Sequence, residues 1–341
     1  MRRVGNLFHQ IPEFDNLRLA FYKASKGKRD RPDQREFSVF LEHQLASIAA
    51  DLTAGTIELG KASRFTIHDP KRREIVAPVF RERVLHHAVM NICEPYFEKF
   101  LIDDTYACRV GKGRIAALQR AQQFSRRFPR AVKLDMRRYF DSICHTELQA
   151  RLRTRFKDER LLDLFQRVVA SHNTSPDTGL PIGSLMSQHL ANFYLGWFDR
   201  FAKQNLRIGG YVRYMDDCIL WGDSSAALRR AAEESSQFLT RELRLEARVP
   251  WAGSLKSGLP FLGCRIFPTH QQLNRRSRRR YRKRMIALDK ALQSGQLTAT
   301  EFQQRTEALT AFTTTGGVKS WKFRQRVIKY MPVSGQRART G

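Results

Sequence analysis

The spacing of apolar residues predicts several helices. Residues 14–55 carry apolar positions three and four apart on both sides of a basic loop, KGKRDRPDQR. A further helix is expected from about Val84, with an interruption at Pro95. Residues 184–201 are apolar on most faces, which predicts a largely buried helix. Amphipathic helices are also predicted over residues 145–171 and 226–243.

Short apolar runs beside turn residues predict strands. Residues 64–79 have the pattern of a β-hairpin around a Pro- and Lys/Arg-rich turn at Asp69–Arg73. A short apolar strand is expected at the start of residues 131–144. The sequence YVRYMDDCILWG at 211–222 predicts a strand, a turn and a second strand. The sequence LPFLGCRIF at 259–267 predicts a strand pair or one strand with a bulge.

The charge balance predicts a polyanionic partner. The 341 residues include 61 Lys and Arg against 33 Asp and Glu, a net charge of +28, and nucleic acid is the first candidate partner for such a chain. Hydrophobic residues make up 42%, which is enough for a core and excludes global disorder. The sequence RRSRRRYRKR at 275–284 has eight basic residues in ten, and helical periodicity continues to about Leu309. A domain boundary is therefore expected near 268–272.

The cysteines and the N-terminal sequence bear on the compartment. Five cysteines are scattered without C-x-x-C pairs, which favours small core residues in a reducing environment over a zinc site or a disulfide framework. The sequence MRRVGNLFHQIPEFDN lacks the apolar region of a signal peptide, and no apolar run approaches the length of a membrane span. We therefore expect a cytoplasmic protein without a membrane partner.

Three aspartates are candidates for a metal site. Asp216 and Asp217 are adjacent in the predicted turn between two apolar strands, where their mutual repulsion is usually compensated by a divalent cation such as Mg²⁺. An ordinary solvated turn would carry the same residues. Asp135, at the end of the strand AVKLD, supplies a carboxylate from a second strand, which a pair of Mg²⁺ ions about 4 Å apart requires. Asp141 is more consistent with a structural or capping carboxylate.

The order of these blocks resembles that of reverse transcriptases. The palm blocks VKLDMRRYFDSI, GLPIGSLMSQ, YMDD and FLGCRI follow in family order, and PKRREIVAPVFRERVLHHA and DDTYACRVGKGRIAAL resemble the fingers blocks. The resemblance covers about residues 60–268. It implies an α+β right-hand polymerase fold with an antiparallel palm sheet. The implied division is N-terminal helices and fingers at 1–130, palm at 131–268 with a fingers-like helical insertion near 145–175, a basic helical thumb at 269–330 and a flexible tail at 331–341.

One block points to a subfamily. Most reverse transcriptases have Pro-Gln-Gly followed by Ser-Pro, whereas this chain has Pro181-Ile182-Gly183 followed by Ser187-Gln188. That pattern resembles the enzymes of diversity-generating retroelements, which misincorporate opposite template adenines. A glutamine can donate and accept hydrogen bonds that position an incoming nucleotide, and Ile182 can do neither. The alternative is that Ile182 only packs beneath the loop.

The resemblance also assigns roles to individual residues. Phe140 occupies the position of an aromatic gate that excludes a ribose 2′-hydroxyl, and Ile182, Gly183 and Gln188 belong to the nucleotide site. Lys71 and Arg73 resemble the residues that contact the triphosphate, although any one basic residue in this chain is also expected on a solvated surface. A nucleic-acid strand is expected to contact Arg109, Lys112, Arg275, Arg276, Arg279, Arg280 and Lys283. Arg109 and Lys112 are alternatively supports of the fingers, and Tyr281 is a further candidate for stacking on a base.

The function implied is an RNA-directed DNA polymerase. It would use two Mg²⁺ ions, with Mn²⁺ as a substitute, and would copy a retroelement template RNA from deoxynucleotides through an RNA/DNA hybrid. The family works with a small basic oligomeric accessory protein, and RNA between two basic partners would offset their repulsion. The alternatives are a phage-defence, intron or retron reverse transcriptase, and a catalytically silent RNA-binding protein on a polymerase scaffold.

Overall fold

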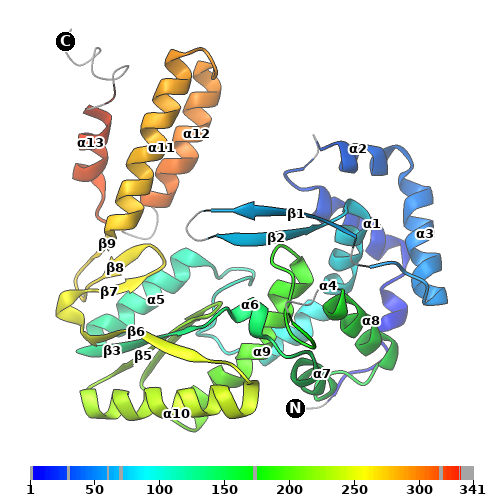
Figure 1. Ribbon diagram of the computed structural model, residues 1–341, viewed down its shortest axis with the longest axis horizontal. Coiled ribbons are helices and arrows are strands. Elements are labelled where there is room, and N and C mark those ends of the chain that lie inside the picture. The colour runs from blue at the N-terminus through cyan, green and yellow to red at the C-terminus, as the bar shows by residue number, and fades with distance from the viewer. Residues whose placement is uncertain are drawn as a thin grey trace. The chain divides into compact units, whose positions relative to one another are not determined.

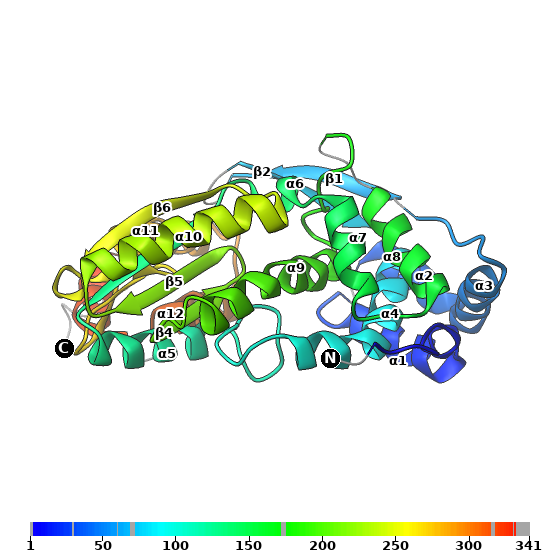
Figure 2. The same ribbon diagram turned by 90° about the horizontal axis from the view of Figure 1, so that it is seen from below.

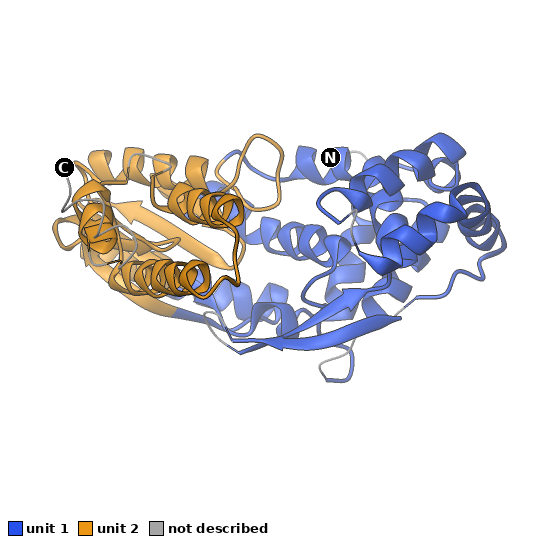
Figure 3. Cartoon of the chain, turned by 90° about the horizontal axis from the view of Figure 1, so that it is seen from above, with its two compact units in different colours: residues 1–103, 135–206, 233–248 blue, residues 104–134, 207–232, 249–341 orange. Residues whose placement is uncertain are grey.

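The computed structural model divides the chain into two compact units, each built from segments far apart in the sequence (Figure 3). Unit 1 contains residues 1–103, 135–206 and 233–248, and unit 2 contains residues 104–134, 207–232 and 249–341. These units cut across the expected division into fingers, palm and thumb, which stays a prediction. The structure describes residues 3–28, 31–59, 61–68, 72–171, 175–314, 318–329 and 331.

Unit 1 is mostly helical (Figure 1). Its longest helix, α4 (Phe80–Phe100), packs against α1 (Phe14–Ser25) and against α9 (Leu185–Gln204), which is largely buried as predicted. Helix α10 (Ser225–Leu243) starts in unit 2 and ends in unit 1. The other helical segments of unit 1 are η1 (Phe8–Gln10), α2 (Pro32–Val39), α3 (Leu41–Ala54), α6 (Tyr139–Ser142), α7 (His145–Arg153) and α8 (Glu159–Ala170).

A β-hairpin in unit 1 confirms the strand prediction for residues 64–79. Strands β1 (Ala62–Ile67) and β2 (Arg73–Pro78) pair antiparallel, with Ala62 opposite Pro78 and Ile67 opposite Arg73. Lys71, which comes between these strands in the sequence, lies outside the residues that the structure describes.

Two helix predictions were wrong in their extent. Helix α4 begins at Phe80 and continues through Pro95 without a break, because packing of its apolar side outweighs the one backbone hydrogen bond that a proline removes. Residues 145–171 form two helices instead of one. The side chain of Asp158 caps α8 by accepting a hydrogen bond from the backbone N–H of Leu161, and this cap starts a new helix.

A four-stranded sheet has the strand order β4-β5-β3-β6. Strands β4 (Gly210–Tyr214) and β5 (Asp217–Gly222) pair antiparallel, which confirms the predicted strand, turn and strand at 211–222. Strand β3 is Arg130–Met136 and β6 is Ala247–Ser254. In unit 2, apolar side chains of β4 and β5 pack with those of α5 (Arg114–Arg127) in one core.

Unit 2 ends in a small sheet and three helices (Figure 1). Strands β7 (Leu259–Phe261), β8 (Cys264–Ile266) and β9 (Gln271–Leu273) are antiparallel, so residues 259–267 form a strand pair. The helices are α11 (Arg275–Gln293), α12 (Ala299–Thr314) and α13 (Trp321–Lys329). Tyr281 is only 2% exposed and packs against Phe323, so the suggestion that it stacks on a base was wrong.

The architecture is α+β, as predicted from the sequence. The five cysteines are free thiols, and four of them are buried. Among the described residues, no helix combines the length and the apolar character needed to cross a membrane.

Candidate active site

The turn that carries Asp216 is anchored from within unit 2. Tyr214 and Asp217 are the last pair of the β4–β5 ladder, and Met215 between them has a φ of +54°, which is uncommon for a residue other than glycine. The side chain of Arg213 is fully buried, and its Nη1 donates a hydrogen bond of 3.1 Å to the Met215 carbonyl. A buried guanidinium therefore holds the backbone of this turn.

The candidate metal carboxylates have cationic neighbours. In unit 2, the Lys133 Nζ lies 2.8 Å from an Asp217 oxygen. In unit 1, Asp135 accepts a hydrogen bond of 2.6 Å from the Nε of Arg248. Carboxylate oxygens are the ligands that Mg²⁺ prefers, so the donor chemistry fits this ion. Within the described part of the chain, no group of three or more His, Cys, Asp or Glu side chains is arranged so that it could hold a metal ion.

The loop at 179–183 is held in unit 1 by backbone contacts. The N–H of Val76 in β2 donates to the Ile182 carbonyl at 2.8 Å, and the N–H of Leu180 donates to the Phe140 carbonyl at 2.8 Å. Gly183 has a φ of +122°, and a Cβ at this position would lie 2.8 Å from the Val76 carbonyl oxygen. The loop is thereby fixed between the β1–β2 hairpin and α6, with Ile182 half-buried.

The two aromatic residues of α6 differ in their surroundings. Tyr139 is buried, and its hydroxyl donates to the Ala191 carbonyl in α9. The Phe140 ring is half-buried and lies 5.7 Å from the Tyr139 ring. Tyr139 is therefore a core residue, whereas Phe140 keeps an accessible face beside the loop.

The predicted triphosphate and nucleotide contacts belong to different elements of unit 1. Arg73 is the first residue of β2 and is exposed, and its side chain makes no hydrogen bond or ion pair with another described residue. Gln188 lies in the first turns of α9 and is half-buried. The structure thus leaves the Arg73 guanidinium available to an anion.

Arg109 and Lys112 are engaged with their own loop in unit 2. The Nη1 of Arg109 donates to the Thr105 carbonyl at 2.8 Å, and the Lys112 Nζ lies 5.2 Å from the centroid of the Tyr106 ring. These contacts favour the supporting role over the strand-binding role for both residues.

The predicted nucleic-acid face of α11 is largely open to solvent. Arg280 is half-buried, with its guanidinium 5.6 Å from the Phe312 ring centroid. The other four predicted contacts are exposed along the first half of the helix: Arg275, Arg276, Arg279 and Lys283.

Two buried histidines, His86 and His189, and the half-buried His87 lie near the start of α9, and the sequence did not single them out. The Ser184 hydroxyl, which caps α9, is within 3.3 Å of the His86 Nδ1. Burial lowers the pKa of His86 to about 3, and lowers those of His87 and His189 to about 4. All three are therefore neutral near pH 7. His86 and His87 are adjacent in the sequence, and nothing in the sequence distinguishes them from two histidines on the surface of a helix.

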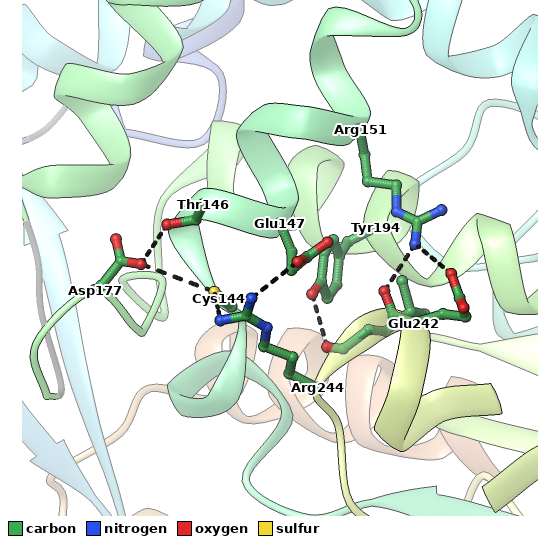
Figure 4. Close-up of polar contacts among 9 residues, drawn as sticks. Cys144, Thr146, Glu147, Arg151, Asp177, Tyr194, Glu242 and Arg244 are labelled. Atoms are coloured by element: carbon green, nitrogen blue, oxygen red, sulfur yellow. Dashed lines mark hydrogen bonds and ion pairs between the residues drawn. The ribbon is translucent and has the colours of Figure 1, made fainter. Parts of the chain in front are cut away.

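A polar network fixes the segment that leads into this loop (Figure 4). Asp177 accepts a hydrogen bond from the Thr146 hydroxyl at 2.5 Å, and the Arg244 Nη2 donates to Glu147 at 3.1 Å. The Tyr194 hydroxyl donates to the Leu243 carbonyl at 2.7 Å. Helix α7, helix α9 and the end of α10 are thus joined on one side of the loop.

Comparisons with known proteins relate this chain to reverse transcriptases. The family model of reverse transcriptase (RNA-dependent DNA polymerase) matches residues 68–250. Protein YkfC of Escherichia coli (strain K12) is 22% identical over 241 residues, covering 58% of this chain and 63% of that protein. The group II intron-encoded protein LtrA of Lactococcus lactis subsp. cremoris is 27% identical over 179 residues, covering 48% of this chain and 29% of that protein.

Among solved structures, a Candida tropicalis telomerase in complex with a fragment of telomeric RNA has a TM-score of 0.46 and 10% identity, covering 85% of this chain and 62% of the other. The chain spans less than two thirds of the length of these relatives. The family model covers more than half of the chain, with the YMDD turn and the 179–183 loop inside the match. The chain belongs to the reverse transcriptase family.

Proposed function

We propose that this chain is an RNA-directed DNA polymerase that makes cDNA by nucleotidyl transfer. The observation that carries the proposal is the Asp216–Asp217 turn, anchored by the buried Arg213, within a chain whose residues 68–250 match the reverse transcriptase model. An ordinary solvated turn has no need of a buried guanidinium, whose desolvation is costly.

Asp135, Asp216 and Asp217 are the proposed ligands of two Mg²⁺ ions. Side chains two positions apart on a strand share a face, so Asp135 and Lys133 point to the same side of β3, and Lys133 pairs with Asp217. When bound, the ions would lower the pKa of the primer 3′-hydroxyl and neutralise charge on the phosphates. Before a metal binds, Lys133 balances the charge of Asp217, and Arg248 balances that of Asp135.

The unit 1 residues are proposed to bind the incoming deoxynucleotide. The exposed guanidinium of Arg73 offers a fork of donors to the triphosphate, with Lys71 beside it in the sequence. The accessible face of Phe140 would clash with a ribose 2′-hydroxyl. Gly183 belongs to the same proposed site, and the loop keeps its course there because a Cβ would lie 2.8 Å from the Val76 carbonyl oxygen.

We further propose the diversity-generating retroelement subtype, in which the template is a retroelement RNA and the cDNA is mutated at adenines. Ile182 supports this, because its half-buried side chain sits in a loop fixed by its backbone and offers the nucleotide no hydrogen bond. A small basic accessory protein would then bind through shared RNA. The match to a group II intron-encoded protein keeps an intron-type enzyme as the second candidate.

Primer extension on a defined RNA template, with the cDNA sequenced, tests both levels of the proposal. We expect synthesis that needs Mg²⁺ and deoxynucleotides, with errors concentrated opposite adenine. Ile182→Gln should reduce those errors several-fold, whereas Ile182→Leu should leave them unchanged. Faithful cDNA from the wild type would remove the retroelement subtype and favour an intron or defence enzyme. If no cDNA is made even with the native RNA and the accessory protein present, a catalytically silent RNA-binding protein would be favoured.

A further inference from the structure

A second basic site lies in unit 1 around the N-terminal segment. A cavity of about 830 Å³ is lined by Arg3, Val4, Gly5, Asn6, Tyr96, Lys99, Arg155, Lys157 and Asp158. Figure 2 shows the N-terminal segment and α4 on the side of unit 1 opposite to the β1–β2 hairpin. The cavity is therefore separate from the residues assigned above to the nucleotide.

The walls of this cavity are fixed by backbone hydrogen bonds. The N–H of Val4 donates to the Arg155 carbonyl at 2.8 Å, and the N–H of Lys157 donates to the Val4 carbonyl at 2.6 Å. The Arg3 guanidinium donates to the Phe156 carbonyl at 3.1 Å. The N-terminal segment thus adds its own cation to those of the chain after α7.

The single carboxylate in the cavity wall offsets at most one of its four positive charges. Asp158 accepts hydrogen bonds from the backbone N–H groups of Leu7 and Phe8, at 3.0 and 2.9 Å, and it also caps α8. No described residue forms an ion pair with any of the four cations in the wall, which are Arg3, Lys99, Arg155 and Lys157. The cavity therefore carries an uncompensated positive charge.

Arg155 carries its positive charge at a buried position, where desolvation makes the charged form less favourable. Its side chain is 9% exposed, and its Nε is buried without a hydrogen-bond partner. Burial and the neighbouring Arg200 lower the pKa of Arg155. Two residues earlier, by contrast, Arg153 is exposed and both oxygens of Glu159 accept from it at 2.7 Å. A buried donor with no partner indicates a ligand that supplies an acceptor.

We propose that this cavity binds the phosphodiester backbone of a folded RNA segment distinct from the copied template strand. Four cations suit several phosphates, and the half-buried ring of Tyr96, with the Lys99 Nζ 5.8 Å from its centroid, offers a surface for a base or ribose. The net charge of +28 favours a nucleic acid over smaller anions. The inference rests on the RNA-directed part of the proposed function but does not require catalysis.

The test compares two variants that each remove two positive charges from exposed positions of unit 1. Lys99→Gln/Lys157→Gln alters the cavity, and Arg18→Gln/Arg153→Gln alters arginines that already pair with Glu42 and Glu159. Circular dichroism and thermal unfolding establish that both full-length variants fold. The probe is a blunt-ended RNA stem–loop, with binding measured between about 50 and 200 mM salt.

The cavity variant should raise the dissociation constant about tenfold and reduce the salt slope by about 2, as expected for two lost phosphate contacts. The control variant should change the dissociation constant by at most about twofold, because exposed ion pairs contribute little. Ultraviolet cross-linking should attach the RNA to the peptide that contains Tyr96.

Three results would overturn the inference. An equal loss in both variants would mean that only net charge matters, and no loss in the cavity variant would mean that RNA binds elsewhere. A cavity variant that loses binding to poly-glutamate but keeps the stem–loop would identify an acidic protein as the ligand. Primer extension on a short pre-annealed duplex reports the polymerase separately, so its failure in the wild type would leave the binding comparison intact.

Discussion

The two turns that carry the candidate chemistry are held in opposite ways. The 179–183 loop of unit 1 is fixed by its backbone, through the hydrogen bond from Val76 to Ile182 and the lack of space beside Gly183. The 214–217 turn of unit 2 is fixed by a side chain, the buried guanidinium of Arg213. Neutral histidines lie near the first turn, and a permanent charge lies behind the second.

This difference shows which substitutions each turn tolerates. Because the loop is held by its backbone, the side chain at position 182 can change without moving the loop, which suits the role in fidelity proposed for Ile182. A side-chain-held turn depends on Arg213, although the residues proposed to contact metal are its neighbours Asp216 and Asp217. The sensitive positions are therefore a glycine in unit 1 and an arginine in unit 2.

The largest expected effect comes from Asp216→Asn, which removes a carboxylate from the second turn and keeps its shape. We expect primer extension to fall by about a thousandfold, equivalent to roughly 4 kcal/mol of barrier. Thermal unfolding should be nearly unchanged. Asp223→Asn, at an exposed position just beyond β5, is the matched control and should keep full activity. Activity retained by Asp216→Asn would contradict the metal assignment.

Gly183→Ala should break the first turn. The new Cβ meets the Val76 carbonyl oxygen at 2.8 Å in a backbone with a φ of +122°. We expect extension to fall about a hundredfold, since small misplacements of reacting groups cost this much, and unfolding to become easier by about 1–3 kcal/mol. Gly55→Ala separates strain from contact, because Gly55 has a φ of +76° but open space around it. If Gly183→Ala and Gly55→Ala lowered the free energy of unfolding equally, only the positive φ would matter and the contact with Val76 would not.

Arg213→Gln should loosen the second turn. It removes the donor to Met215 and leaves a smaller side chain in a fully buried site. We expect kcat to fall about thirtyfold with little change in the KM for deoxynucleotide, because the residue positions the carboxylates and does not touch substrate. Arg213→Lys should recover part of kcat. A loss of stability with unchanged kcat would make the arginine purely structural.

Much of this arrangement could be predicted from the sequence, because it depends on local patterns. The β1–β2 hairpin, helix α9 and the β4–β5 turn follow from apolar spacing and turn residues, and the family blocks supplied the carboxylates. The passage of α4 through Pro95 could not, because it depends on the helices that pack around it. Arg213 looks like a surface residue in the sequence, and only tertiary burial gives it its role.

The smallest expected effect is a pH dependence that separates the two turns. Burial, with a smaller contribution from His87, lowers the pKa of His189 to about 4, whereas an unfolded histidine titrates near 6.5. The folded state therefore takes up fewer protons below pH 6.5. The stability that this histidine contributes is complete above that pH and is lost as the pH falls towards 4.

Between pH 7 and pH 5, His189 alone should lower the free energy of unfolding by about 2 kcal/mol. Urea unfolding at the two pH values measures this change, and His189→Gln should reduce the pH dependence by a similar amount. Limited proteolysis at pH 5 should cut unit 1 before unit 2, since Arg213 stays charged behind the second turn. An identical pH dependence in wild type and His189→Gln would mean that the histidine is hydrated in the folded state, and the contrast between the turns would then rest on Gly183 and Arg213 alone.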